Sequence, residues 1–421
     1  MGIAPPAAGD ILQRQPACLD GGLATPKFDA SSAKPGDRST ERAGMTPGGF
    51  SASLIDRGYA AWNRLVASTR FQRWASGFPL TRPIARNRQR ALFDLCAGFV
   101  YSQILLACVR LRLFDILQEG PQTVAALAPR LALSESATER LLAAAVSLRL
   151  VARRGAGRFG LGQLGAALAG NPAITAMVEH HTMLYADLGD PVALLRGEQA
   201  GTELGRYWPY AEREPGTAAP KPEQVASYTA LMADSQPMIA AEVLDAYKLD
   251  HHRCLLDIGG GDGSFLAAAA ARAPALRVIL FDLPPVAERA KARFAAAGLG
   301  DRATAVGGDF RTDTLPPGAD VVSLVRVIHD HDDATVMAVL RAIHAALPAD
   351  GTLLVAEPMS GTPGAEPVGD AYFGFYLLAM GRGRPRTFGE LSTMLRSAGF
   401  REIRLVSTRS PLLTRLITAR P

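Results

Sequence analysis

Hydrophobic residues recur at helical spacing through residues 91–170. In the first part of this stretch apolar positions fall three or four residues apart, which predicts a long amphipathic helix. Two short helices are predicted at 123–131 and 136–148, and two strand-like pieces then flank a glycine-containing turn within 151–161. A helix, a turn, a second helix and a hairpin in this order predict a winged helix.

Beyond residue 226 the pattern changes to short apolar runs separated by helical stretches. Strands that alternate with helices predict an α/β fold with a doubly wound, mainly parallel sheet, whose ligands bind beyond the carboxyl ends of the strands. The last two runs are close enough in the chain to form a terminal hairpin. The predicted strands are Arg253–Ile258, Arg277–Asp282, Ala303–Val306, Asp320–Ile328, Thr352–Glu357, Glu402–Ser407 and Leu413–Ala419.

The chain therefore divides into four segments. Residues 1–50 are rich in Pro, Gly, Ala and Ser without periodicity, and we expect a disordered tail to which we assign no function. A basic, amphipathic arm follows at 51–90. The mostly helical winged-helix region occupies 91–225 and closes in a proline-containing linker, and the α/β domain fills 226–421.

The arm has a distinctive composition. Between residues 53 and 90 eight arginines stand against one acid, Asp56. The aromatic residues among them are Tyr59, Trp62, Phe71, Trp74 and Phe78. Arginine stems and aromatic rings together suit a membrane surface that carries anionic lipid. They equally suit a solvated arm that packs on a partner subunit, and the sequence leaves both interpretations open.

Composition adds three expectations. The most apolar stretch, 91–113, is broken by Asp94, Ser102, Gln103 and Arg110, so we predict no membrane-spanning helix. The four cysteines have no metal or redox spacing and no signal peptide opens the chain, which predicts a cytoplasmic protein with reduced thiols. The net charge of +5 is small for this length and hints at an anionic partner without establishing one.

A glycine-rich turn follows the first predicted strand of the α/β domain. Gly259, Gly261 and Gly263 come directly after Asp257, and glycines at this spacing let the backbone turn sharply and approach a ligand closely. A dinucleotide fingerprint would need its third glycine at the position where Ser264 stands. The spacing therefore favours S-adenosylmethionine over NAD, although such a turn alone also occurs as a purely structural feature.

Three further side chains stand where a bound nucleoside needs them. Asp282 ends the second predicted strand and is placed to accept hydrogen bonds from both ribose hydroxyls. Asp309 follows the third strand and could accept from the adenine amino group, with Phe310 beside it to cover a ring face. An N-cap aspartate and a core phenylalanine are the plainer interpretations of the last two taken alone. Together with the glycine turn, the three predict an S-adenosylmethionine site.

A histidine ends the fourth predicted strand. His329 lies beside the expected cofactor, where it can remove a proton from a hydroxyl that attacks a methyl group. Glu357 ends the fifth strand and is placed to hold the other imidazole nitrogen. His331 and the acids at 330, 332 and 333 raise the alternative of a metal cluster. Because acidic side chains at consecutive positions cannot all face one ion, we predict no metal.

These motifs resemble the plant-type and acetylserotonin-type O-methyltransferase family over residues 91–421. The stretches that carry the resemblance are Leu255–Gly263, Phe281–Pro284, Gly308–Phe310, Val327–Asp330 and Ala356–Pro358. The resemblance implies a class I methyltransferase fold with a Rossmann-like sheet, an N-terminal winged-helix dimerisation domain and a homodimer. It also implies that His329 is the base and Glu357 its orienting acid, while the glycine turn, Asp282, Asp309 and Phe310 hold S-adenosyl-L-methionine.

The sequence departs from the plant-type pattern at two positions. His331 stands where a tryptophan often follows the His-Asp pair. Pro385 stands where a second glutamate is expected just before Arg386. We therefore expect His329 to be flanked by only one acid.

Within the family the chain resembles the bacterial carotenoid O-methyltransferases of the hydroxyneurosporene and demethylspheroidene type, on residues 91–103, 190–197 and 369–381. This resemblance implies methylation of the tertiary 1-hydroxyl of an acyclic carotenoid, as in spheroidene- or spirilloxanthin-type biosynthesis. A bacteriochlorophyll-pigment methyltransferase looks similar, so pigment rings, phenolics and polyketides stay open as acceptors. We expect the acceptor pocket to draw on the following residues, about half of which are equally well explained as ordinary core: His180, Met183, Tyr185, Tyr372, Phe373, Tyr376 and Met380.

Two other function classes compete with this one. Winged helices also occur in DNA-binding regulators, but the start of the second short helix carries Glu135 and Glu139, which DNA phosphates would repel. A non-catalytic dimer partner would bind the cofactor and transfer nothing, which the intact His329 and Glu357 argue against. We expect an enzyme without a nucleic-acid partner, located in the cytoplasm or peripherally at the inner face of the membrane.

Overall fold

The computed structural model describes residues 48–199, 201–207 and 236–421. The predicted tail lies almost entirely outside these residues, and so does the predicted linker that precedes the α/β domain. The chain separates into two compact units, Met1–Ala91 and Leu92–Pro421.

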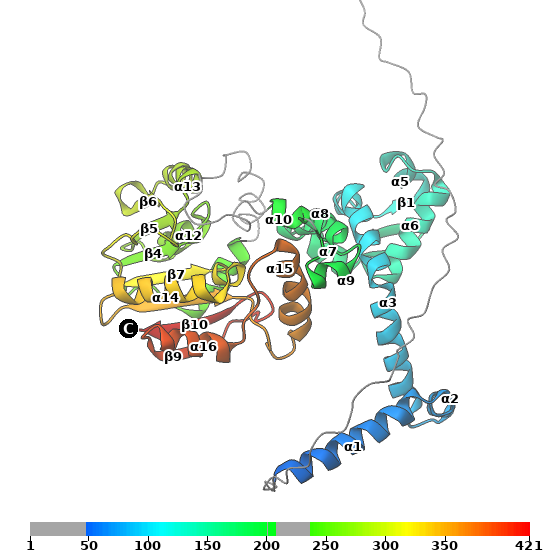
Figure 1. The fold of residues 1–421 in the computed structure, drawn as a ribbon. Helices are drawn as coiled ribbons and strands as arrows, with labels where there is room; N and C mark the ends of the chain where they lie inside the picture. The colour runs from blue at the N-terminus through cyan, green and yellow to red at the C-terminus, as the bar shows by residue number, and fades with distance from the viewer. Residues whose placement is uncertain (1–47, 200, 208–235) are drawn as a thin grey trace, which may run out of the picture. The chain divides into compact units, whose positions relative to one another are not determined.

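The described part of the first unit is helical (Figure 1). It contains α1 (Gly48–Ala67), α2 (Thr69–Gly77) and the first turns of α3 (Arg82–Arg110). A single residue, Ser68, separates α1 from α2. Its backbone is extended, which ends one helix and begins the next.

Among the described residues one helix, α3, is long and apolar enough to cross a membrane by length and composition alone. The polar positions that were expected to break this stretch, such as Asp94 and Ser102, leave an apolar window of the required length. At its carboxyl end, however, Leu106, Cys108 and Val109 are buried in a protein core. The absence of a membrane-spanning helix thus stays a prediction.

The second unit begins with the winged helix that the sequence predicts. The motif comprises α4 (Leu113–Gln118), α5 (Val124–Arg130), α6 (Glu135–Ser147) and an antiparallel sheet of order β1-β3-β2, with β1 Gln122–Thr123, β2 Val151–Arg154 and β3 Arg158–Leu161. Thr123 and Ser134 start α5 and α6, because each side chain accepts a hydrogen bond from a backbone N–H of the first turn. Buried leucines, including Leu127 and Leu142, join these helices to α3 in one core.

Residues 236–246 form a helix before β4, and four more helices follow the winged helix within the described part of 163–207. They are α7 (Gln163–Ala169), α8 (Pro172–Asp187), α9 (Pro191–Arg196) and α10 (Glu203–Tyr207). Asp187 ends α8, and its buried carboxylate accepts hydrogen bonds from the backbone N–H groups of Glu203 and Leu204. This carboxylate therefore caps α10, which would otherwise begin with unsatisfied donors.

A seven-stranded sheet of order β6-β5-β4-β7-β8-β10-β9 forms the α/β domain (Figure 1). The strands are β4 Cys254–Ile258, β5 Arg277–Asp282, β6 Ala303–Gly307, β7 Val321–Val325, β8 Thr352–Glu357, β9 Arg401–Val406 and β10 Arg415–Arg420. The first five are parallel, and β10 runs antiparallel to both β8 and β9. The predicted doubly wound sheet and the terminal hairpin are confirmed.

Helices cover both faces of this sheet. One core packs α14 (Asp333–Ala346) and α16 (Phe388–Ser397) against it, and the other packs α12 (Ser264–Arg272) and α13 (Pro284–Ala296). Because the central strands are buried on both faces, β4, β7 and β8 are buried at every position. The remaining elements are η1 (Gly300–Arg302), η2 (Ile328–Asp330), the π-helical η3 (Pro367–Phe373) and α15 (Gly374–Met380).

Candidate active site

The sheet places the predicted site residues along one edge. β4 pairs with β5 on one side and with β7 on the other, so the strand order reverses at β4. In open α/β sheets the crevice at such a reversal, beyond the carboxyl ends of the strands, is where ligands bind. Asp257, Asp282, His329 and Glu357 all lie at or just after the carboxyl ends of β4, β5, β7 and β8.

The glycine turn after β4 is held tightly against its neighbours. Gly259 donates a backbone hydrogen bond to the carbonyl of Phe281 (2.8 Å) and has a φ of 67°. A Cβ at Gly259 would lie 3.0 Å from the side chain of Val327 and would be strained at this φ, so glycine is favoured there. Gly261, with a φ of 61°, has open space where its Cβ would be. The turn thus leaves room for a ligand to approach the backbone.

Two carboxylates flank the turn, that of the buried Asp257 and that of the half-buried Asp282. Asp257 accepts a hydrogen bond from the Ser323 hydroxyl at 2.6 Å through Oδ1, while its Oδ2 has no hydrogen-bond partner among the described residues. Burial raises the pKa of Asp257 to about 7. Asp282 accepts hydrogen bonds from the backbone N–H groups of Gly261 (2.8 Å) and Leu283 (2.7 Å), and burial raises its pKa to about 6. These oxygens fit a ligand that brings ribose hydroxyls and an ammonium group as donors.

The predicted adenine site follows β6. The carboxylate of Asp309 is held by the guanidinium of Arg311, with Nε 2.9 Å from Oδ1 and Nη2 2.6 Å from Oδ2. Burial alone would raise the pKa of Asp309, but the hydrogen bonds from Arg311 lower it. Phe310 meets His331 edge to face at 5.3 Å between ring centroids, and burial lowers the pKa of His331 to about 4. A neutral imidazole therefore stands where the plant-type pattern has tryptophan, and the adenine contacts stay a prediction.

The predicted strand Asp320–Ile328 ends earlier, at Val325, so His329 does not end a strand but lies in η2, where it is buried beside Glu357. Its Nδ1 is hydrogen-bonded to Oε2 of Glu357. The other carboxylate oxygen, Oε1, accepts from the backbone N–H groups of Val327 (2.9 Å) and Ile328 (2.8 Å). Because a carboxylate only accepts, Nδ1 carries the hydrogen and Nε2 is left as the basic nitrogen. The predicted pairing of base and orienting acid is therefore present in the structure.

A second acid lies at the other side of the imidazole. Asp330 Oδ1 is 3.1 Å from His329 Nε2 and has no hydrogen-bond partner among the described residues. Burial would lower the pKa of His329, but the carboxylates of Asp330 and Glu357 outweigh it and the pKa is raised. Burial raises the pKa of Asp330 to about 6. The expectation that only one acid flanks the base is wrong, since Asp330 lies against Nε2 while Glu357 is hydrogen-bonded to Nδ1.

Arg386 braces the loop that carries His329. Its buried guanidinium donates through Nη1 to the carbonyl of Ile328 (2.7 Å) and through Nη2 to the carbonyl of His331 (2.8 Å). It also pairs with Asp333, 2.6 Å from Nη2 to Oδ1. The sequence did not predict this role, because Arg386 is one of several arginines in a Gly- and Arg-rich stretch and no periodicity distinguishes it from the others. From the sequence, Asp330 was predicted only as a possible metal ligand, and its position against the imidazole of His329 was missed.

The predicted acceptor residues fall into two groups. Phe373 contacts His329 edge to face at 5.9 Å, and Tyr372 packs on Phe373 at 5.0 Å, so these two lie beside the base. His180 Nε2 is hydrogen-bonded to the Tyr376 hydroxyl at 2.6 Å. One apolar cluster contains Met183 on α8, Tyr372 on η3, and Tyr376 and Met380 on α15. Tyr185 is half-buried on α8.

The helix α8 is linked to the base through η3. His181 Nε2 is hydrogen-bonded to the Tyr372 hydroxyl at 2.8 Å. Burial lowers the pKa of both His180 and His181, to about 4 for His180, so both imidazoles are neutral. The predicted acceptor residues on α8, η3 and α15 therefore serve partly as packed core and partly as a wall beside His329.

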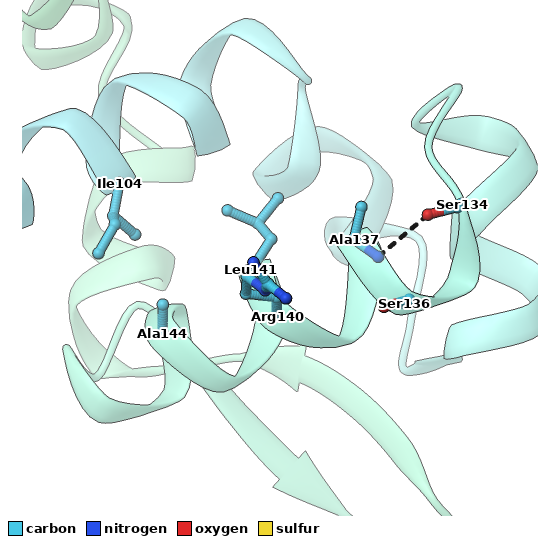
Figure 2. Close-up of a pocket in the computed structure, with 7 residues that line it drawn as sticks. All are labelled: Ile104, Ser134, Ser136, Ala137, Arg140, Leu141 and Ala144. Carbon is cyan, nitrogen blue, oxygen red and sulfur yellow. Dashed lines mark hydrogen bonds between the residues drawn. The ribbon is translucent and has the colours of Figure 1, made fainter.

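A separate pocket of about 550 Å³ lies in the winged-helix region between α3 and the start of α6 (Figure 2). The residues that line it are Ile104, Ser134, Ser136, Ala137, Arg140, Leu141 and Ala144. It includes neither the glycine turn nor the His329 loop, so it is not the catalytic site. Over the residues that the structure describes, no three His, Cys, Asp or Glu side chains gather as metal ligands would.

Comparisons with known proteins agree with this geometry. Residues 185–401 match a family model described as the O-methyltransferase domain, and residues 93–171 match one described as the O-methyltransferase dimerisation domain. Demethylspheroidene O-methyltransferase from Cereibacter sphaeroides is 45% identical over 85% of this chain and 93% of that protein. The enzyme of the same name from Rhodobacter capsulatus is 38% identical over 94% of this chain and 99% of that protein.

A solved structure gives the same result at lower identity. Human N-acetylserotonin methyltransferase, in complex with SAM, superposes with a TM-score of 0.66 at 27% identity, covering 79% of this chain and 97% of that chain. The glycine turn, the carboxylates of Asp257 and Asp282, and the His329–Glu357 pair thus belong to a fold in which one solved relative holds SAM and another holds SAH. The chain is a member of the plant- and acetylserotonin-type family of S-adenosylmethionine-dependent class I O-methyltransferases, with an N-terminal dimerisation domain.

Proposed function

We propose that the acceptor is the tertiary 1-hydroxyl of an acyclic carotenoid. The two bacterial relatives named above are demethylspheroidene O-methyltransferases, and the similarity to them extends over most of both chains. The observation that carries the chemistry is the buried His329, oriented by Glu357 at the carboxyl edge of the sheet. A tertiary alcohol is a very weak acid, so its attack on a methyl group needs a base in a site that excludes water.

The arrangement supports direct displacement. S-adenosylmethionine supplies an electrophilic methyl group bonded to a sulfonium sulfur. His329 Nε2 accepts the hydroxyl proton while the acceptor oxygen bonds to the methyl carbon and the carbon–sulfur bond breaks. Glu357 keeps the hydrogen on Nδ1 and stabilises the imidazolium that forms. Asp330 Oδ1, 3.1 Å from Nε2, stabilises the imidazolium from the other side of the ring.

Positioning supplies the largest share of the rate. Well-oriented reactants gain up to about 7–11 kcal/mol, and a general base adds roughly 10²–10⁴-fold. Phe373 and Tyr372 form an apolar wall beside the base, which suits a long hydrocarbon acceptor. The proposed acceptor dissolves in the bilayer, so we also place the enzyme in the cytoplasm at the inner face of the membrane.

The test is a turnover assay. Purified protein is incubated with S-adenosylmethionine and a 1-hydroxylated acyclic carotenoid in detergent, and the product is read by mass spectrometry. A product with one added methyl group supports the acceptor. Methylation of a bacteriochlorophyll-type pigment, a phenolic or a polyketide in parallel tubes, with none of the carotenoid, would contradict it while keeping the enzyme class.

A DNA-binding regulator is the remote alternative. The O-methyltransferase family membership and the exposed carboxylates of Glu135 and Glu139 at the start of α6 argue against it. A salt-dependent gel shift with the full chain tests the point.

A further inference from the structure

We propose that α1, α2 and the first turns of α3, residues 55–90, form a docking surface for bilayers that contain anionic lipid. The proposal rests on the proposed function only for its purpose, which is access to an acceptor dissolved in the membrane. The surface itself is argued from the side chains of these helices.

The first observation is a row of four aromatic rings, of which three are exposed and Phe71 is half-buried. Trp62, Phe71, Trp74 and Phe78 contact one another in sequence, with ring centroids 6.3, 5.6 and 5.2 Å apart. Trp62 is 48% exposed, Trp74 54% and Phe78 41%. Soluble proteins rarely leave contiguous rings uncovered, and aromatic side chains of this kind are favoured at the headgroup level of a membrane.

Further apolar side chains are exposed on and between the same helices. Ile55, Tyr59 and Trp62 are spaced four and three residues apart in α1, which places them on one helical face. Leu80, before α3, and Ile84, in its first turn, are exposed as well. Of the side chains described in 55–90, only Ala75 is buried. Each helix therefore presents an uncovered apolar face.

The second observation is charge. All eight arginines of the arm are exposed, and Asp56 is its single acid. The arm thus carries a net charge of +7, larger than the +5 of the whole chain, so the rest of the chain is net negative. Each arginine near an anionic surface raises the membrane affinity by a factor of about ten or less. A net positive charge concentrated in the helices with exposed rings is the pattern of an interfacial, lipid-binding segment.

The proposed membrane contact is peripheral, and α3 does not cross the bilayer. The apolar window of α3 passes the length criterion only if it includes its carboxyl end, where Leu106, Cys108 and Val109 are buried in the winged-helix core. Residues 91–103 alone would rise roughly 20 Å as a helix, less than the roughly 30 Å hydrocarbon core of a bilayer.

Vesicle flotation with the full chain tests the surface. The probes are vesicles of equal parts phosphatidylglycerol and phosphatidylcholine, and vesicles of phosphatidylcholine alone. We expect binding to the anionic vesicles in low salt and its loss in high salt. We expect Arg70→Gln/Arg73→Gln to weaken binding by roughly 30-fold or less, and Trp62→Ser/Trp74→Ser to weaken it at least as much.

Matched controls remove the same groups elsewhere. Arg289→Gln/Arg341→Gln takes two exposed arginines from the α/β domain, and Leu195→Ser takes an exposed apolar side chain from α9. Both controls should bind like the wild type. Equal loss in the control and arm variants, or equal binding of the wild type to neutral vesicles, would overturn the proposal.

Two further outcomes also decide against it. If the arm variants become monomeric in light scattering and still float normally, the arm contacts the partner subunit. If alkaline carbonate does not extract the protein from the vesicles, the protein is inserted in the bilayer and is not peripheral. Turnover of acceptor in detergent is measured on the same variants and should be unchanged, so a failed docking surface is separable from a failed acceptor assignment.

Discussion

Arg386 donates a hydrogen bond to the backbone carbonyl of Ile328, the residue directly before His329. The same guanidinium reaches the carbonyl of His331 on the other side of the histidine. The loop that carries the base is thus held at both ends by one buried side chain from a segment more than fifty residues later in the chain. This relationship gives the first prediction.

Replacing Arg386 with lysine keeps the charge but removes the planar fork that bridges both carbonyls and Asp333. We expect kcat to fall by up to about 100-fold, because a misplaced base loses the aligned geometry, while the cofactor Kd changes little. Steady-state kinetics and calorimetry measure the two. Arg396→Lys, at an exposed position of α16, is the control. Equal losses in kcat and cofactor affinity would mean that Arg386 only supports the fold.

Glu357→Gln should damage catalysis about as much as His329→Ala. The amide oxygen can still accept from Val327 and Ile328 N–H, but the amide nitrogen then faces Nδ1 as a donor and forces the hydrogen onto Nε2. A base in the wrong tautomer costs up to about 10⁴-fold. Single-turnover assays on both variants, with exposed Glu366→Gln as control, measure this. Near-normal turnover in either variant would contradict the assignment of His329 as the base and Glu357 as its orienting acid.

The dependence of kcat/KM on pH should show how the neighbouring carboxylates shift the pKa of His329. His329 must be neutral to accept a proton, and although burial lowers its pKa, Asp330 and Glu357 raise it above the ordinary value. Activity should therefore fall as pH drops through a value above that of ordinary histidine. Asp330→Asn removes one of the raising charges, so the acid limb of kcat/KM should move to lower pH. With Asp350→Asn, an exposed control, the limb should stay in place.

Asp282→Asn should weaken cofactor binding. Its carboxylate already accepts from Gly261 and Leu283, and it is placed to accept from the ribose as well. Hydrogen bonds to charged groups contribute about 1.5–3 kcal/mol, so we expect Kd for S-adenosylmethionine to rise at least about tenfold. Titration calorimetry measures this against exposed Asp301→Asn. An unchanged Kd would place the ribose elsewhere.

The exposed apolar face of α3 should mediate dimer formation. Leu95 is 80% exposed and Phe99 68% exposed, one helical turn apart, within the segment that matches the dimerisation domain. Leu95→Asp/Phe99→Ser should therefore shift the protein from dimer to monomer in light scattering. Leu164→Ser, an exposed position on α7, should stay dimeric. A wild-type protein that is monomeric at all concentrations would refute this assignment.

The sequence by itself determined the order of elements and the central chemistry. Every predicted strand of the α/β domain is present, and the central strands β4, β7 and β8 were the clearest, because runs buried on both faces are largely apolar. His329 and Glu357 could be paired from the sequence because parallel strands bring their carboxyl ends to one edge. The glycine turn could be recognised because positive φ at Gly259 and Gly261 demands that residue type.

Only the tertiary structure decided the neighbours of the base. Asp330 turns back onto His329 Nε2, and Arg386 reaches the same loop from a distant segment. The carboxylate of Asp309 is held by Arg311, which no strand pattern indicates. These contacts depend on loop conformation and on residues far apart in sequence, and side-chain periodicity carries no information on either. Local patterns therefore sufficed to identify the enzyme class, while the electrostatic surroundings of its base required the folded chain.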